Sequence, residues 1–370
     1  MSNITSAIVL AGGKRRLNLK DRIKYFFQDL YYRGDRPLYC HAIYKPLDVK
    51  LVFKEKRKEV ELPLILHKLI NIVKVKQLKE IIVVGKKDEI IKDKSIKSFL
   101  KKTKKKIIIV DQEEELPLTI LKNLKVKRIK KATLAYNGVL GYAMSKAYKK
   151  ENAALFTTVD DTLTTTEEYE LMLKQHKEQI AFIYPWVKET ELKKYNWKHR
   201  FYLRLFEAKN QSKPHSLVKR ILYWIAKKKR KDNRVGRRVA SMILANPLLI
   251  KRFSVVNTTY YARKIKDIPV LVWYFGRYAV SFIWKYCILF NLTMEDINKR
   301  ANSLLKANGY TCDLSIPLSS LDLDTDKDAS ATIRTYNELR HSSPSFVYRK
   351  MRLKSVRYYD KRGNCFKELF

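Results

Sequence analysis

Two glycines follow a short apolar run near the start of the chain, and three cations follow the glycines. The stretch AIVLAGGKRR runs from Ala7 to Arg16. Glycines let backbone N–H groups approach a phosphate closely, and Lys or Arg side chains neutralise its charge. The pattern indicates phosphate binding at the end of a strand. The alternative is a tight glycine turn followed by solvated cations.

Acidic residues end another apolar run and occur again in a segment far along the chain. AALFTTVDD ends in Asp160 and Asp161, and SLDLDTDKDASATI contains Asp322 and Asp324. Carboxylate oxygens are hard ligands that suit Mg²⁺, which takes one or two of them together with substrate phosphates and water. These residues are therefore candidates for a magnesium site.

Other chemistries lack their residue patterns. The chain has no GxxxxGK[ST] loop and no GxGxxG turn, which argues against P-loop and dinucleotide-binding sites. The six histidines show no HExxH spacing, and the four cysteines form no CxxC pair. We therefore expect no structural zinc site, and we expect a reducing, cytoplasmic setting without a secretory signal.

Helix-like stretches alternate with four short apolar runs, three of which are rich in Ile and Val. Continuous rather than alternating hydrophobicity is typical of strands buried on both faces of a parallel sheet. This order predicts an α/β fold with a doubly wound, mostly parallel sheet, in which ligands bind at the carboxyl ends of the strands. The expected strands are 7–11, 80–85, 106–111 and 153–161, and the expected helices are 62–75, 88–102 and 137–150.

Four parts of the sequence together resemble the nucleotidyltransferase superfamily with the GT-A-type fold, which is nucleotide-diphospho-sugar transferase-like. They are AIVLAGG with its cations, LPLILHKLINIVKVKQLKEIIVVG, ALFTTVDDTLTTTEEYELML, and LTMEDINKRANSLLKANGY followed by SLDLDTDKDASATI. The last is similar to the closing segment of a MobA-like subgroup. The resemblance implies transfer of a nucleoside monophosphate from a nucleoside triphosphate to a small phosphorylated acceptor. Mg²⁺ would be the cofactor and pyrophosphate the second product.

The resemblance also implies roles for individual residues. Arg16 and Asp160 are the expected catalytic residues. Asp160 is also the expected metal ligand, and Asp322 or Asp324 would complete the Mg²⁺ site. The residues expected to bind the nucleotide are Leu10, Ala11, Gly12, Gly13, Lys14, Arg15 and Asn137.

Some positions fit the family less directly. Asn137 has an alternative as a plain N-cap of a helix, and Lys45 is a candidate for the family's early lysine. KRRLN replaces the third glycine of the loop, Asp161 and Thr162 replace the usual Pro and hydrophobic residue after Asp160, and RLFEAKNQSKPHS lacks a Gly-Gly-Asn element. These departures keep a second function open, that of a catalytically degenerate relative. It would act as a binding protein at an anionic membrane surface or on nucleic acid.

Positive charge is concentrated in the middle of the chain. The whole sequence has 78 Lys and Arg against 37 Asp and Glu, a net charge of +41. Residues 213–266 hold sixteen of these cations and one acid, Asp232. Cations interleaved with aromatic residues at helical spacing indicate helices that pack on the sheet as an insertion with their cations facing water, and a peripheral membrane contact is the alternative. Nucleic acid ranks below both because the sequence has no RNP1-like or GxxG element.

These observations predict four parts. A nucleotidyltransferase core is expected at 1–212, a basic, aromatic helical insertion at 213–292, a return to the core with the second acidic motif at 293–340, and an extension at 341–370. The Lys-Arg-Gly-Asn sequence in the extension predicts a hairpin. The expected location is cytoplasmic, and membrane association through the basic helices is the open alternative.

Overall fold

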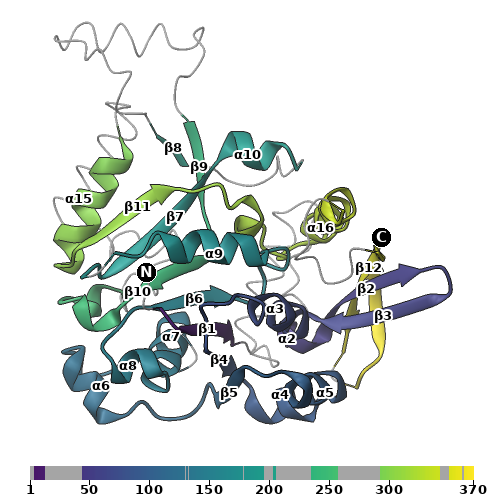
Figure 1. The fold of residues 1–370 in the computed structure, drawn as a ribbon, viewed down its shortest axis with the longest axis horizontal. Helices are drawn as coiled ribbons and strands as arrows, with labels where there is room; N and C mark the ends of the chain where they lie inside the picture. Colours follow the sequence, from purple (N-terminus) through teal and green to yellow (C-terminus); the bar gives the residue numbers. More distant parts are fainter. Residues whose placement is uncertain are drawn as a thin grey trace, which may run out of the picture.

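The computed structural model describes most of the residues predicted to form the core. The described residues are 4–12, 44–129, 131, 133–177, 179–195, 203–205, 235–256, 292–341, 350–360 and 362–370. They form a nine-stranded sheet and, beside it, a four-stranded sheet (Figure 1). Gly13, Lys14, Arg15 and Arg16 lie outside the described residues.

The large sheet is mixed, with its parallel strands at one side. Its strands run in the order β5-β4-β1-β6-β10-β7-β9-β8, and β11 pairs with β7. Adjacent strands are parallel from β5 to β6 and between β7 and β11, and antiparallel elsewhere. The strands are β1 (Ser6–Ala11), β4 (Glu80–Gly85), β5 (Lys106–Asp111), β6 (Ala154–Thr158), β7 (Phe182–Lys188), β8 (Leu203–Leu205), β9 (Val235–Val239), β10 (Met242–Ala245) and β11 (Gly309–Asp313). The prediction of a mostly parallel α/β core is confirmed for the four strands that carried it.

Helices cover both faces of this sheet (Figure 1). The helices of the described residues are α2 (Lys45–Asp48), α3 (Leu64–Ile72), α4 (Lys87–Lys92), α5 (Lys94–Lys102), α6 (Leu118–Asn123), α7 (Leu134–Ala143), α8 (Lys146–Lys149), α9 (Thr166–Lys174), α10 (Glu189–Lys193), α15 (Met294–Leu305) and α16 (Asp326–Leu339). Successive side chains of β1 enter opposite cores because strand residues alternate between the two faces of a sheet. Val9 packs with α3 and α9, whereas Ile8 packs with α7. The sheet is therefore doubly wound.

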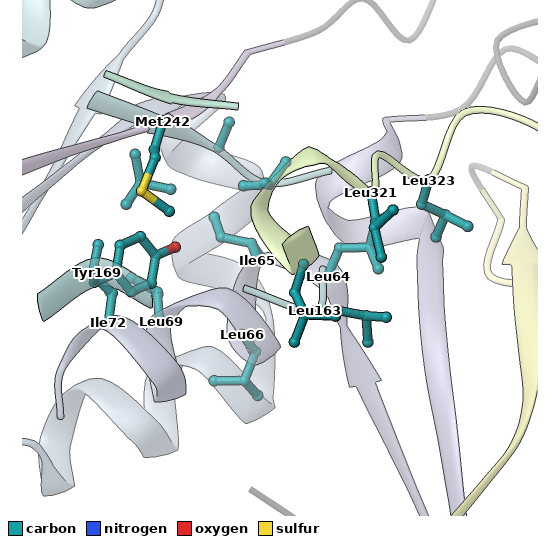
Figure 2. Packing of buried hydrophobic residues seen from close by; sticks show 14 of the residues in the cluster. Leu64, Ile65, Leu66, Leu69, Ile72, Leu163, Tyr169, Met242, Leu321 and Leu323 are labelled. Carbon is teal, nitrogen blue, oxygen red and sulfur yellow. The ribbon is translucent and has the colours of Figure 1, made fainter. Parts of the chain in front are cut away.

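The core around α3 connects distant parts of the chain. Figure 2 shows Leu64 and Ile65 of α3 among buried side chains from the loop after β6 and from the segment before α16. Leu163 belongs to that loop, and Leu321 and Leu323 belong to that segment. This packing brings the two predicted acidic motifs to one edge of the sheet.

One part of the predicted helical insertion belongs to the sheet instead. The insertion was predicted at 213–292, but β9 and β10 lie within that range and pair with β6, β7 and β8. The prediction depends on apolar and aromatic residues at helical spacing among the cations. The structure gives Arg237 an ion pair with Asp313 and gives Arg238 an ion pair with Asp322, so both cations are accommodated in a strand. Residues 213–234 and 257–291 lie outside the described residues, and the rest of the predicted division stays a prediction.

The C-terminal residues form part of the smaller sheet, which has the order β13-β12-β2-β3. Its strands are β2 (Val49–Glu55), β3 (Lys58–Pro63), β12 (Arg352–Tyr359) and β13 (Cys365–Leu369), all antiparallel. The turn between β12 and β13 contains Gly363 at φ 85, a backbone conformation that favours glycine. Because β12 also pairs with β2, the C-terminal hairpin shares a sheet with β2 and β3 from the N-terminal half of the chain.

None of the helices in the described ranges is long and apolar enough to cross a membrane. The segment 268–292, which is largely apolar and aromatic but contains Arg277 and Lys285, lies outside those ranges apart from Leu292.

Candidate functional site

Four parallel strands end at the same edge of the large sheet. The register pairs Ala11 of β1 with Gly85 of β4, Gly85 with Asp111 of β5, and Leu10 with Thr158 of β6. In open α/β sheets, ligands bind beyond this carboxyl edge. The predicted site residues of the described ranges lie near this edge.

Gly12 lies against the side chain of Asn137. A Cβ atom at position 12 would lie 2.1 Å from Asn137 Nδ2 and 3.1 Å from Gln112 Oε1, so the close approach requires glycine. Asn137 is 4% exposed, and its Oδ1 has no hydrogen-bond partner among the described residues. A buried amide oxygen without a partner is costly. Beside Gly12, the Asn137 Oδ1 atom is thus able to accept a hydrogen bond from a ligand N–H or O–H.

Asn137 is not the N-cap of its helix. Thr133 caps α7, because its hydroxyl accepts a hydrogen bond of 3.1 Å from the Tyr136 N–H. Asn137 lies one turn further into the helix and is buried. The alternative interpretation of Asn137 as a plain N-cap is therefore wrong.

Leu10 and Ala11 are part of the hydrophobic cores. Leu10 packs in the core on the α7 side, and Ala11 packs in the core on the α3 side. Their main chain, rather than their side chains, borders the carboxyl edge. The Ala11 carbonyl is already engaged, because it accepts a 2.6 Å hydrogen bond from the hydroxyl of Tyr44.

Tyr44 connects three elements at this edge, although no pattern in the sequence distinguishes it. Its hydroxyl accepts a 2.9 Å hydrogen bond from the Lys86 N–H while donating to Ala11. It occupies space left by the missing side chain at Gly85, where a Cβ atom would lie 2.5 Å from the Tyr44 hydroxyl. Tyr44 directly precedes Lys45, the first residue of α2. The two hydrogen bonds of the Tyr44 hydroxyl therefore fix the position at which α2 begins.

Lys45 joins the two acidic motifs. Its Nζ lies 3.3 Å from Asp160 Oδ2 and 2.9 Å from Asp324 Oδ1. Burial alone would lower the pKa of Lys45, but attraction to Asp324 and Asp160 outweighs burial and raises that pKa well above its ordinary value. Two carboxylates therefore converge on one positive charge at the carboxyl edge.

Asp322 lies nearby but has other partners. Its Oδ2 lies 3.0 Å from Nη2 of Arg238, and the hydroxyl of Ser241 donates to its other oxygen. Burial, followed by the negative charges of Asp160 and Asp324, raises the pKa of Asp322 to about 6. Of the two predicted alternatives, Asp324 shares a cation with Asp160, whereas Asp322 is bound by β9 and the turn after it.

Backbone contacts hold the two acidic motifs together. The Leu323 N–H donates to the Asp160 carbonyl at 2.9 Å. Asp328, in the first turn of α16, accepts hydrogen bonds from the N–H groups of Asp324 and Thr325 at 3.1 and 2.8 Å. The proximity of Asp160 and Asp324 thus depends on main-chain geometry as well as on Lys45.

The acidic residues fit Mg²⁺ as a two-carboxylate site. No group of three or more His, Cys, Asp or Glu side chains in the described part of the chain is arranged to hold a metal ion. Mg²⁺ usually binds one or two protein carboxylates and takes its other ligands from substrate phosphates and water. Asp160 and Asp324 supply that number, and they already converge on a cation in the form of Lys45.

Comparisons with known proteins give structural likenesses only. No protein-family model matches the sequence, and no curated protein matches it. A hypothetical transferase from Thermus thermophilus is 16% identical with a TM-score of 0.47, covering 88% of this chain and 99% of that one. A 4-diphosphocytidyl-2C-methyl-D-erythritol synthase from Anaerococcus prevotii is 11% identical with a TM-score of 0.36, covering 88% and 94%. A CMP:2-keto-3-deoxy-manno-octonic acid synthetase, solved with CTP, is 10% identical with a TM-score of 0.33, covering 84% and 90%.

Proposed function

We propose that this chain is a Mg²⁺-dependent nucleotidyltransferase that transfers a nucleoside monophosphate from a nucleoside triphosphate to a small phosphorylated acceptor. The observation that carries the proposal is the convergence of Asp160 and Asp324 on one cation at the carboxyl edge. Gly12 and the unsatisfied amide of Asn137 lie along the same edge. In this proposal the main chain at Gly12 would approach the polyphosphate, the Asn137 oxygen would accept a hydrogen bond from the nucleoside, and the two aspartates would hold the divalent cation.

In the proposed reaction, an acceptor phosphate oxygen forms a bond to the α-phosphorus. The bond from that phosphorus to the bridging oxygen breaks, and pyrophosphate leaves with the electron pair. Phosphoryl-type transfers depend mainly on positioning and charge neutralisation, so no nucleophilic side chain is needed. Mg²⁺ held by Asp160 and Asp324 would supply part of that neutralisation.

The protein side chains would divide the remaining tasks. Lys45 has three donors on a flexible stem, so it serves the two carboxylates in the free protein and the phosphates when nucleotide and metal are present. Asn137 would accept a hydrogen bond from the nucleotide near Gly12. Arg16, which lies outside the described residues, is proposed to neutralise the polyphosphate as the resemblance implies.

Nucleotide binding tests the proposal directly. Melting temperatures would be measured with ATP, GTP, CTP and UTP, each with and without Mg²⁺. We expect one nucleotide to raise the melting temperature of the wild type only when Mg²⁺ is present, and we expect Asp160→Ala to lose this effect. Glu295→Ala is the matched control, because Glu295 is an exposed acid that pairs with Lys299 on α15.

A second assay tests turnover, namely pyrophosphate release when small phosphorylated compounds are added. If no nucleotide changes the wild-type melting temperature, the transferase proposal fails. The non-catalytic function at an anionic membrane surface or on nucleic acid would then be favoured. Binding to vesicles that contain anionic lipid would be measured next.

A further inference from the structure

The residue that follows Asp160 is a second aspartate, and it points into the protein interior. Asp161 is 0% exposed. Its Oδ2 accepts hydrogen bonds from the hydroxyls of Thr157 and Thr164 at 3.2 and 3.0 Å. Its Oδ1 is bound by the ammonium group of Lys68 from α3. Asp161 therefore takes no part in the two-carboxylate site, although it adjoins Asp160 in sequence.

Lys68 is as deeply buried as its partner. It is 1% exposed, and its Nζ also lies 3.4 Å from the Asp161 carbonyl oxygen and 5.2 Å from the centre of the Tyr169 ring. Removing two charges from water is costly, and an apolar pair of similar volume is often equally stable or more stable. The pair is thus poorly explained by stability alone.

Helix α3 holds the loop between β6 and α9 at two places. Besides the Lys68–Asp161 contacts, Asn71 Nδ2 donates to the Thr164 carbonyl at 3.3 Å, and the Thr166 hydroxyl donates to the Asn71 carbonyl at 3.1 Å. The hydroxyl of Thr164 donates to the Asp161 carbonyl at 3.1 Å. The main chain on the C-terminal side of Asp160 is therefore fixed by side chains of α3 and of the loop itself.

The same network reaches the segment that carries Asp324. Leu323, which lies near the α3 core in Figure 2, donates its N–H to the Asp160 carbonyl at 2.9 Å. Glu168 on α9 accepts a 2.8 Å hydrogen bond from the Leu318 N–H, earlier in that segment. The position of Asp160 relative to Asp324 therefore depends on the β6–α9 loop as well as on the hydrogen bond from Leu323.

We propose that Lys68 and Asp161 form a positioning pair that aligns the Asp160 carboxylate with Asp324 for binding of Mg²⁺ with nucleotide. The inference rests on the proposed function. It gives the aspartate that replaces the expected Pro a definite task, since hydrogen bonds to α3 and to two threonines fix the chain at this position. Neither residue contacts the reacting atoms.

The test uses the full-length double variant Lys68→Met/Asp161→Leu, which replaces the ion pair by apolar side chains. Dissociation constants are measured for ATP, GTP, CTP and UTP with and without Mg²⁺, and the ratio of the two values gives the Mg²⁺-dependent gain in affinity. We expect a melting temperature close to that of the wild type and a gain reduced by about tenfold to a hundredfold, as for partners that orient metal ligands. Val356→Ala is the control, because it disturbs the buried side of β12 away from the loop.

Each outcome decides the inference. A reduced Mg²⁺-dependent gain in the double variant, with an unchanged gain in Val356→Ala, supports it. A lowered melting temperature with an unchanged gain would show a purely structural pair and overturn it.

If the double variant does not fold, Thr164→Val replaces it. We expect this variant to reduce the Mg²⁺-dependent gain roughly fivefold, for the loss of one hydroxyl. An unchanged gain in Thr164→Val would overturn the inference. A wild type without any Mg²⁺-dependent gain overturns the proposed function and the inference together, whereas failure of the inference alone leaves the wild-type gain intact.

Discussion

Glu168 gives a quantitative prediction about stability and pH. Its side chain is buried beneath the proposed site, one oxygen accepts the Leu318 N–H, and the other has no hydrogen-bond partner among the described residues. Burial, which outweighs the hydrogen bond from Leu318, raises the pKa of Glu168 from 4.5 to about 8. The folded protein therefore holds a proton at neutral pH that the unfolded chain has released.

The sign and size of the effect follow from this difference. Between the unfolded and folded pKa values, the folded state binds more protons, so the free energy of unfolding falls as pH rises. The slope is about 1.4 kcal/mol per pH unit. From about pH 5 to about pH 7.5, the wild type should lose about 3 kcal/mol through Glu168 alone. Glu168→Gln keeps an acceptor for Leu318 and carries no charge, so it should lack this part of the decline.

The assay is urea unfolding of the wild type and Glu168→Gln at several pH values across this range. The two curves of unfolding free energy against pH should converge toward the acid end and separate toward neutral pH, with the variant relatively more stable there. Glu170→Gln removes a less buried carboxylate from the same helix and serves as the control. Parallel curves for the wild type and Glu168→Gln would refute the reasoning, because they would mean that Glu168 is ionised in the folded protein.

Two further predictions concern the carboxyl edge. Lys45→Met leaves Asp160 and Asp324 facing each other without the ammonium group, so Mg²⁺ alone should bind about fivefold more tightly than to the wild type, a gain of about 1 kcal/mol for partly exposed charges. A Mg²⁺ titration followed by melting temperature measures this, and equal or weaker binding would contradict it. Gly12→Ala should displace the Asn137 amide and weaken nucleotide binding by about 1–3 kcal/mol with little change in helix content. Calorimetric titration with nucleotide and circular dichroism measure the two quantities, and unchanged affinity would place the nucleotide elsewhere.

Sequence alone predicted the parallel part of the large sheet because the information there is local. Each of those strands lies in a short, continuous apolar run, and helical stretches lie between the runs. The smaller sheet depends on pairing between distant segments, since Leu51 of β2 lies opposite Val356 of β12. Nothing within either strand specifies a partner about 300 residues away. For the same reason β9 was missed, because the partners of Arg237 and Arg238 are near them only in the folded chain.

As with the fold, the sequence predicted those parts of the site that depend on local patterns. Residue type and position after a strand selected Gly12 and Asp160, and the family resemblance offered Asp322 or Asp324 as the second carboxylate. The structure brings Asp160 and Asp324 together around Lys45. Tyr44 was missed because its hydroxyl matters only through the space at Gly85, which the sequence does not connect to it. Arg238 was hidden in a run of cations, where only the fold distinguishes a partner of Asp322 from a solvated side chain.

Asp161 stands where the resemblance leads us to expect Pro, and the two residues restrain a chain in different ways. Proline restrains its own backbone through its ring and needs no partner. An aspartate has no such restraint, so its position depends on the groups that bind its carboxylate, here Lys68, Thr157 and Thr164. A departure that suggested loss of activity at the level of sequence thus coincides with a dense set of contacts in the structure. The restraint here is shared between α3 and the loop. A substitution of Lys68 should therefore change the position of Asp160, because Lys68 binds Asp161, the next residue in the chain.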